Sequence, residues 1–171
     1  MRDVKGDRSL SPSQQEDPDL FVHISKRDEN GIYISGAKAH QTGCINSHWI
    51  LVMPTMRLRD EDKQYAFVGA IPADAEGITY IYGRQSCDTR SMESGDLDAG
   101  NSKFSGQEAM IIFDNAFIPN DLIFMDGEYE FASMLVERFT CYHRRSYVCK
   151  TGLGDVLIGA AASIADYNGI S

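Results

Sequence analysis

Apolar and polar residues alternate along much of the first 125 residues, which is the pattern of half-buried β-strands rather than of helices. Residues 20–26 alternate in this way, and residues 32–34 resume the pattern after Asn30-Gly31. An Asn-Gly pair between two such runs predicts a hairpin whose two turn residues both have positive φ. Turn-rich segments separate the further strands that the pattern predicts, at residues 49–53, 65–71, 78–82, 109–113 and 116–124.

Two polar segments interrupt this alternation. Residues 1–19 carry Pro12 and Pro18 and predict an extended arm. Residues 84–108 are polar and contain glycine, and loops of this length in compact domains are usually functional or disordered. Several short strands with turns between them predict an antiparallel β-sandwich or barrel, and we place this β domain at residues 1–128.

The periodicity changes near Gly127, after which apolar residues recur at steps of three and four. This predicts a helix over residues 131–142, and Gly152 and Gly154 are expected to interrupt the helical pattern. Asp155 is the type of residue that caps a helix N-terminus, so a second helix is expected over residues 156–167. These helices need a partner to bury them. We therefore expect residues 129–171 to be the start of a helical C-terminal domain that is truncated in this chain.

Composition narrows the classes of function. The net charge is −9, which argues against binding to nucleic acid because phosphates require a basic face. No apolar run reaches the about 18 residues of a membrane span, and the start lacks the apolar core of a signal peptide. We expect a cytoplasmic protein whose four scattered cysteines are mostly buried free thiols.

The first candidate for chemistry is the polar loop His40-Gln41-Thr42-Gly43, which closes an alternating run. Its side chains offer amide and hydroxyl hydrogen bonds, and a glycine lets the backbone approach a ligand closely. A flavin ring needs such donors at its nitrogen and oxygen atoms. The alternative is an ordinary turn at the end of a strand, where threonine and glycine are also common.

The second candidate lies in residues 137–150, where His143, Tyr147 and Cys149 follow one another on a predicted helix. Histidine and cysteine thiolate can both ligate an iron–sulfur cluster. Positions i and i+4 share a helix face, so His143 and Tyr147 can point into one site. The alternative is that the histidine and the cysteine are ordinary core or surface residues.

These two segments together resemble the flavin- and iron–sulfur-dependent 4-hydroxybutyryl-CoA dehydratase/vinylacetyl-CoA isomerase family, whose wider relatives are the 4-hydroxyphenylacetate 3-hydroxylase flavoproteins. The resemblance covers nearly the whole chain, which matches about the middle third of such an enzyme. It implies an acyl-CoA dehydrogenase-type β middle domain, and residues 111–123 resemble the strand pair that ends that domain. It also implies FAD as a cofactor, with Thr42 tuning the flavin, and the flavin-binding positions carried over are Lys5, Asp7, Arg8, His40, Gln41, Thr42, Ser47 and His48.

The resemblance further implies a [4Fe-4S] cluster held by three cysteines and one histidine. It assigns the metal ligands His143 and Cys149 to this chain, and it assigns catalytic roles to His143, Tyr147 and Thr42. The other two cysteines and a catalytic glutamate belong to regions outside the chain. The family carries two glycines between the tyrosine and the cysteine, whereas only Val148 stands here. On a regular helix Cys149 would lie about 120° from His143, so we expect a break or bulge between Tyr147 and Lys150.

The function implied for the intact enzyme is the reversible loss of water from 4-hydroxybutyryl-CoA by radical chemistry, together with isomerisation of vinylacetyl-CoA. The expected partner is an acyl-CoA substrate, and the intact enzyme is expected to be a homo-oligomer. One alternative is a flavin-dependent aromatic hydroxylase, which needs no cluster. Another is a catalytically inactive fragment. We expect the isolated chain to be inactive and to bind FAD weakly or not at all, with His40, Gln41 and Thr42 lining an open groove.

Overall fold

The computed structural model describes residues 2–4, 6–82, 108–143 and 145–170, and for residues 2, 140–143 and 145–150 it describes the backbone alone. The predicted polar loop at 84–108 lies, except for Glu108, outside the described residues. Contacts divide the chain into two compact units, Met1–Ser133 and Met134–Ser171. The first unit contains the β-strands and the second contains most of the helical part.

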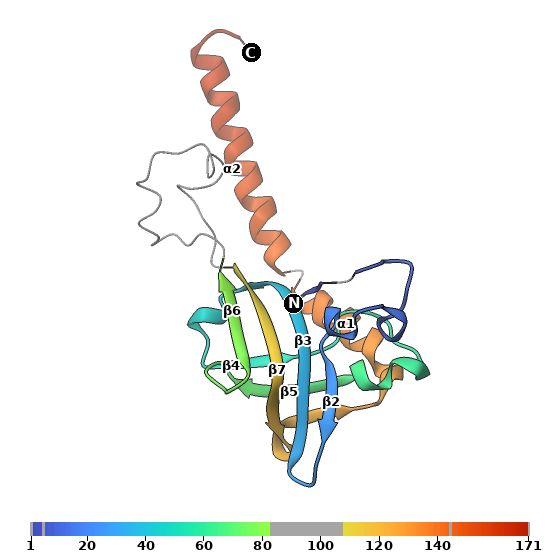
Figure 1. Cartoon of the computed structure of the whole chain (residues 1–171). Helices are drawn as coiled ribbons and strands as arrows, with labels where there is room; N and C mark the ends of the chain where they lie inside the picture. Colours follow the sequence, from blue (N-terminus) through green and yellow to red (C-terminus); the bar gives the residue numbers. More distant parts are fainter. Residues whose placement is uncertain (1, 5, 83–107, 144, 171) are drawn as a thin grey trace. The chain divides into compact units, whose positions relative to one another are not determined.

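Two long antiparallel strands, β3 (Gly31–Thr42) and β7 (Glu108–Pro119), form the centre of the first sheet (Figure 1). The strand β6 (Ile78–Tyr82) lies on the other side of β7. The short strand β1 (Arg2–Asp3) pairs with the second half of β3, and β2 (His23–Arg27) pairs with its first half. All these pairings are antiparallel, as the sequence predicts.

The second sheet has the order β4 (Trp49–Val52), β5 (Phe67–Pro72) and β8 (Ile123–Asp126), again antiparallel. Figure 1 shows β4 and β5 running crosswise behind the strands of the first sheet. Apolar side chains from both sheets meet in one core, which includes Ile32, Ile34, Ile111, Phe113 and Ile118 from the first sheet and Ile50, Val52, Phe67 and Ile71 from the second. The mainly β, antiparallel fold with a helical end is therefore confirmed.

The hairpin at Asn30-Gly31 is present, but its predicted turn geometry is wrong. Neither residue has a positive φ. The carboxylate of Asp28 instead accepts hydrogen bonds from the backbone N–H groups of Asn30, at 2.8 Å, and Gly31, at 3.1 Å. An aspartate that caps its own turn in this way replaces the left-handed conformation that an Asn-Gly pair would otherwise supply.

The two strands predicted at 109–113 and 116–124 are wrong as separate elements. The structure has one strand, β7, which bulges where Asp114 and Asn115 lie opposite Ser35. Asn115 has a φ of 51°, which asparagine tolerates, and its backbone N–H donates to the Ser35 hydroxyl at 3.1 Å. A 3-10 turn, η7 (Asn120–Leu122), then leads to β8. A second such turn, η4 (Asp60–Tyr65), shifts the start of β5 from the expected Tyr65 to Phe67.

The arm predicted at residues 1–19 is folded onto the first unit through short 3-10 turns, η1 (Pro12–Gln14) and η2 (Pro18–Leu20). The buried carboxylate of Asp62 holds η1 in place. It accepts the backbone N–H of Ser13 at 3.0 Å through one oxygen and that of Arg59 at 3.1 Å through the other. The arm is therefore an integral part of the β domain.

Another 3-10 turn, η8 (Tyr129–Phe131), leads into α1 (Ala132–His143), and α2 follows at Arg145–Tyr167. The predicted interruption at Gly152 and Gly154 is wrong, because α2 runs through both glycines. Asp155 therefore lies within the helix and does not cap its N-terminus. Each glycine costs only about 1 kcal/mol in a helix, which the flanking helix formers offset. Among the described helices, none combines the length and apolar character needed to cross a bilayer.

Candidate functional site

A β-bulge in β3 shapes the candidate site. Lys38 pairs with Ile111 and Gln41 pairs with Ala109, so β3 advances three residues while β7 advances two. His40 lies in this bulge with a φ of 56°, a conformation that non-glycine residues rarely adopt. Such strain tends to occur at functional sites, because only a well-ordered surrounding structure can hold it in place.

Glu108, the first residue of β7, joins the two exposed side chains that flank Gln41. Its Oε2 lies 3.2 Å from Nδ1 of His40, and its Oε1 accepts the Thr42 hydroxyl at 3.1 Å. Since a carboxylate is only an acceptor, Nδ1 of His40 carries the proton. Sequence reasoning missed Glu108, because it follows a long polar segment and meets its partners only through the pairing of β3 with β7.

Gln41 does not share the exposed surface of His40 and Thr42. Its side chain is buried, and its Nε2 donates to the carbonyl of Ala39 at 2.5 Å. The expectation that all three residues line one open groove is therefore wrong for Gln41. The bulge is the reason, because it turns Gln41 to the interior and leaves His40 and Thr42 on the outside.

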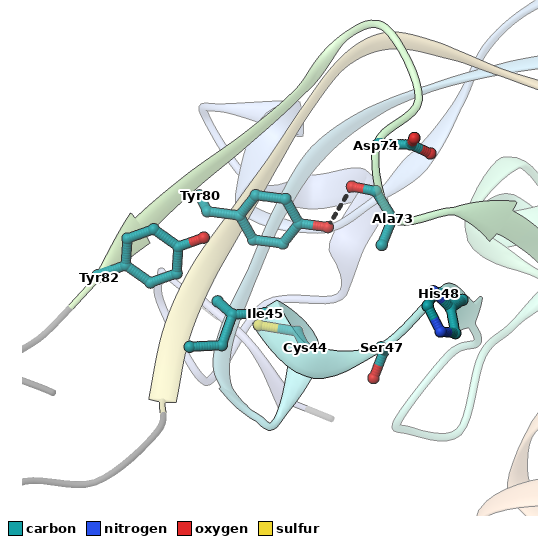
Figure 2. Close-up of a pocket in the computed structure, with 8 residues that line it drawn as sticks. All are labelled: Cys44, Ile45, Ser47, His48, Ala73, Asp74, Tyr80 and Tyr82. Carbon is teal, nitrogen blue, oxygen red and sulfur yellow. Dashed lines mark hydrogen bonds between the residues drawn. The ribbon is translucent and has the colours of Figure 1, made fainter. Parts of the chain in front are cut away.

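Ser47 and His48 lie beyond the turn formed by Gly43 and η3 (Cys44–Asn46), and they line a groove of about 270 Å³. The hydroxyl of Ser47 donates to the Gly43 carbonyl at 3.0 Å, and the His48 carbonyl accepts the backbone N–H of Ala73 at 2.9 Å. Figure 2 shows their side chains beside the remaining lining residues, which are Cys44, Ile45, Ala73, Asp74, Tyr80 and Tyr82.

Two tyrosines from β6 form one wall of this groove. The rings of Tyr80 and Tyr82 stack with an interplanar angle of 6° and a centroid distance of 6.0 Å, and the Tyr80 hydroxyl donates to the Ala73 carbonyl at 2.7 Å (Figure 2). Burial raises the pKa of Tyr80 to about 12, with smaller contributions from Cys44, Tyr82 and Asp74. Burial also raises the pKa of the Cys44 thiol, so this cysteine stays protonated at neutral pH.

The N-terminal flavin-side candidates lie on a compact loop. Lys5 lies outside the described residues, whereas Asp7 and Arg8 are exposed. The backbone N–H and the hydroxyl of Ser9 both donate to the Asp7 carboxylate, which lowers the pKa of Asp7. The side chain of Gln15 accepts the Asp7 backbone N–H at 3.0 Å and donates to the Asp7 carbonyl at 2.8 Å.

The candidate cluster residues lie in two helices rather than one. His143 is the last residue of α1, while Tyr147 and Cys149 belong to α2, which is helical from Arg145 onward. The break expected between Tyr147 and Lys150 is therefore wrong. The helix-face argument that led to it assumed one continuous helix from His143 to Cys149. The directions of these three side chains lie outside what the structure describes, so their assignment as ligands stays a prediction.

Comparisons with known proteins reveal close relatives. Over 171 residues, the chain is 61% identical to 4-hydroxybutyryl-CoA dehydratase/vinylacetyl-CoA-Delta-isomerase of Clostridium aminobutyricum. The matched region covers 99% of this chain and 35% of that protein. The solved structure of an oxygen-tolerant archaeal 4-hydroxybutyryl-CoA dehydratase from N. maritimus is 76% identical, with a TM-score of 0.81 over 99% of this chain and 34% of that chain. The chain thus spans about a third of the length of these relatives.

A more distant structure shares the fold. The oxygenase component of 4-hydroxyphenylacetate 3-monooxygenase complexed with FAD is 24% identical, with a TM-score of 0.59 over 77% of this chain and 26% of that chain. The family described as 4-hydroxyphenylacetate 3-hydroxylase N terminal matches residues 1–125, and the corresponding C-terminal family matches residues 132–171. The chain therefore belongs to the 4-hydroxyphenylacetate 3-hydroxylase family.

Proposed function

We propose that this chain is the flavin-side portion of a 4-hydroxybutyryl-CoA dehydratase that also isomerises vinylacetyl-CoA. The observation that carries the proposal is the 61% identity to the clostridial dehydratase across the chain, compared with 24% for the FAD-bound hydroxylase component. The 76% identity to the archaeal dehydratase structure supports it independently. Residues 1–128 would form the β middle domain, and residues 129–171 would begin the helical C-terminal domain.

The end of β3 fits a flavin. His40 and Thr42 present polar atoms on the exposed side of the strand. A Cβ added to Gly43 would meet no atom within 4 Å, so a flat ring has room to approach the backbone here. The residues that would hold FAD are Lys5, Asp7, Arg8, His40, Gln41, Thr42, Ser47 and His48, with Gln41 acting through its backbone because its side chain is buried.

FAD, when bound, would supply the one-electron chemistry that acidifies the unactivated β-hydrogen of the substrate. The chain's contribution is to fix polar groups in a defined orientation. Glu108 accepts from both Thr42 and His40, so the Thr42 oxygen keeps its lone pairs for a ligand donor, and Nε2 of a neutral His40 can accept a hydrogen bond. Hydrogen bonds at a flavin ring tune its electronics, and this is the role we assign to Thr42.

In the intact enzyme, a [4Fe-4S] cluster would supply Lewis-acid chemistry for the departure of the hydroxyl group. We assign His143 and Cys149 as two of its four ligands, because imidazole and thiolate are suitable ligands for such a centre. The other two ligands would come from regions outside this chain. Tyr147 would act at the substrate, and His143 would take part in proton transfer as well as ligation.

The reaction converts 4-hydroxybutyryl-CoA into crotonyl-CoA and water, so one proton and one hydroxyl leave the substrate. The isomerisation of vinylacetyl-CoA moves a proton without loss of water. We propose that the partner is an acyl-CoA thioester and that the intact enzyme is a cytoplasmic homo-oligomer. The isolated chain would be inactive, because the remaining cluster ligands and the catalytic glutamate lie elsewhere.

A flavin-dependent aromatic hydroxylase is the second candidate. The family match and the shared fold with an FAD-bound oxygenase component favour it. A hydroxylase needs no cluster, so His143 and Cys149 would then have no metal to bind. A third reading is a catalytically inactive fragment.

Anaerobic purification of the full-length protein that contains this chain tests the proposal. Flavin and iron would be quantified per protomer, and crotonyl-CoA formation would be followed from 4-hydroxybutyryl-CoA and from vinylacetyl-CoA. We expect FAD, iron and both activities. Flavin without iron, together with hydroxylation of a phenol, would support the hydroxylase, and absence of both cofactors would support the inactive fragment.

A further inference from the structure

Lys38 is a buried lysine, and its charge is matched within the first unit. Lys38 and Asp3 are 2% and 6% exposed. The Lys38 ammonium donates to the Asp3 carboxylate and, at 2.9 Å, to the Met53 carbonyl. The Thr55 hydroxyl donates to the second oxygen of Asp3. The cluster of Lys38, Asp3 and Thr55 thus joins three separate segments of the chain.

The cluster lies next to two candidate flavin-binding segments, the loop at residues 6–10 and the bulged end of β3. Asp3 pairs with Lys38 across β1 and β3, and the loop at residues 6–10 follows β1 after only a few residues. On the other strand, Lys38 is the last residue before the bulge that contains His40. The backbone N–H of Val4 donates to the Leu20 carbonyl at 3.2 Å, which fixes the start of the loop on its other side.

A buried ion pair is an expensive way to hold two strands together, because both charges lose their hydration. Apolar residues of similar volume would pack there at least as well. What an ion pair adds is direction, since Lys38 can satisfy its ammonium only when Asp3 and the Met53 carbonyl occupy defined positions. The cluster therefore fixes the relative position of β1 and β3 more sharply than apolar packing would.

We propose that Lys38 is a positioning residue that holds the N-terminal loop at residues 6–10 and the bulged end of β3 as one unit. The effect on the cofactor rests on the proposed flavin function, in which Asp7 and Arg8 contact the flavin from the loop and His40 and Thr42 contact it from β3. Loss of Lys38 would let these two sides of the flavin site move independently.

Hydrogen exchange of the full-length protein tests the coupling without reference to the cofactor. In Lys38→Met we expect exchange to accelerate at least about tenfold in both residues 4–10 and residues 38–42, because a charge-assisted anchor is lost. Thr55→Val, which removes one hydroxyl, is the milder variant should Lys38→Met fail to fold, and it should accelerate the same two segments to a smaller extent. Faster exchange in only one segment, or in neither, would overturn the proposal.

Asp62→Asn is the matched control, because Asp62 is an equally buried carboxylate that pins Ser13 and Arg59 instead. It should accelerate exchange near those two residues and leave residues 38–42 unchanged.

The affinity for FAD then separates a positioning role of Lys38 from a role in general stability. We expect Lys38→Met to weaken FAD binding at least about tenfold relative to Asp62→Asn at equal loss of thermal stability. Equal weakening in both variants would reduce Lys38 to a structural residue, whereas coupled exchange in a protein that binds no FAD would contradict only the proposed function.

Discussion

The Glu108 carboxylate accepts the Thr42 hydroxyl at 3.1 Å, which ties the first residue of β7 to the last residue of β3. The same carboxylate meets His40 across the bulge. One acidic side chain thus orients both exposed polar groups that we assign to the flavin.

Glu108→Gln should lower the rate of crotonyl-CoA formation about 10- to 100-fold. A glutamine amide offers one oxygen where the carboxylate offers two, so either His40 or Thr42 loses the hydrogen bond that fixes its orientation. Stability should change by less than about 1 kcal/mol, because the site is exposed. The control is Glu128→Gln, whose exposed carboxylate accepts the Asp126 backbone N–H instead. Wild-type activity in Glu108→Gln would remove Glu108 from the site.

His40→Gly should be more stable than His40→Ala by about 1 kcal/mol. Alanine would keep the strain of a left-handed backbone at φ 56°, whereas glycine relieves it. Thr79 is an exposed strand residue in β6 without a positive φ, so Thr79→Gly should be less stable than Thr79→Ala. Both His40 variants should bind FAD more weakly than the wild type. Urea unfolding and flavin titration measure the two effects, and unchanged FAD affinity would show that the strain serves the fold alone.

Tyr80 should make stability fall at high pH. The pKa of Tyr80 is raised from 10.0 to about 12 in the folded protein, mainly by burial. The unfolded chain therefore releases the phenolic proton first. The stabilisation is fully present below pH 10 and is lost as the pH rises towards 12. Tyr80→Phe should flatten the fall in stability across this interval, while Tyr82→Phe, on the neighbouring exposed ring, serves as control. Identical pH profiles for wild type and Tyr80→Phe would contradict the assignment.

Asp62→Asn should destabilise the first unit by about 2 kcal/mol. The asparagine amide would face a backbone N–H that the carboxylate oxygen now satisfies, which leaves a buried donor without its partner. Asp60→Asn is the surface comparison. Asp60 pairs with Lys63 at 2.7 Å, but both side chains are exposed, so the loss should stay below about 1 kcal/mol. Equal losses in the two variants, measured by urea unfolding, would refute the role of Asp62.

The sequence pattern predicted the strands well because their core residues alternate strictly. Ile32 and Ile34, for example, face the core with Tyr33 between them. The sequence pattern failed where side-chain hydrogen bonds, rather than the backbone preferences of the turn residues, set the geometry. Asp28 satisfies the hairpin turn that Asn30-Gly31 would otherwise form through positive φ values. The continuity of α2 through Gly152 and Gly154 was also missed, since helix propensity is a weak guide at single positions.

The candidate site was predictable only in part. Polar residue types at 40–43 marked the end of a strand, and the resemblance gave them a role. Glu108 could not be found in this way, because its contact with His40 depends on strand pairing across 68 positions of sequence. The burial of Gln41 depends on a bulge, and alternation alone does not reveal where a strand gains an extra residue.

The extra residue in β3 also makes the length of this segment a constraint of its own. Between Lys38 and Gln41 the strand changes phase, so that both residues face the interior despite an odd separation. Deleting one residue there would restore a regular pleat in which Lys38 and Gln41 lie two positions apart, so Gln41 would still face the interior and Thr42 the outside. The pairing of Gln41 with Ala109 would be kept, while the bulge and its left-handed residue would be lost. The length of this segment therefore sets the backbone geometry at His40, whereas the faces of Gln41 and Thr42 would survive the deletion.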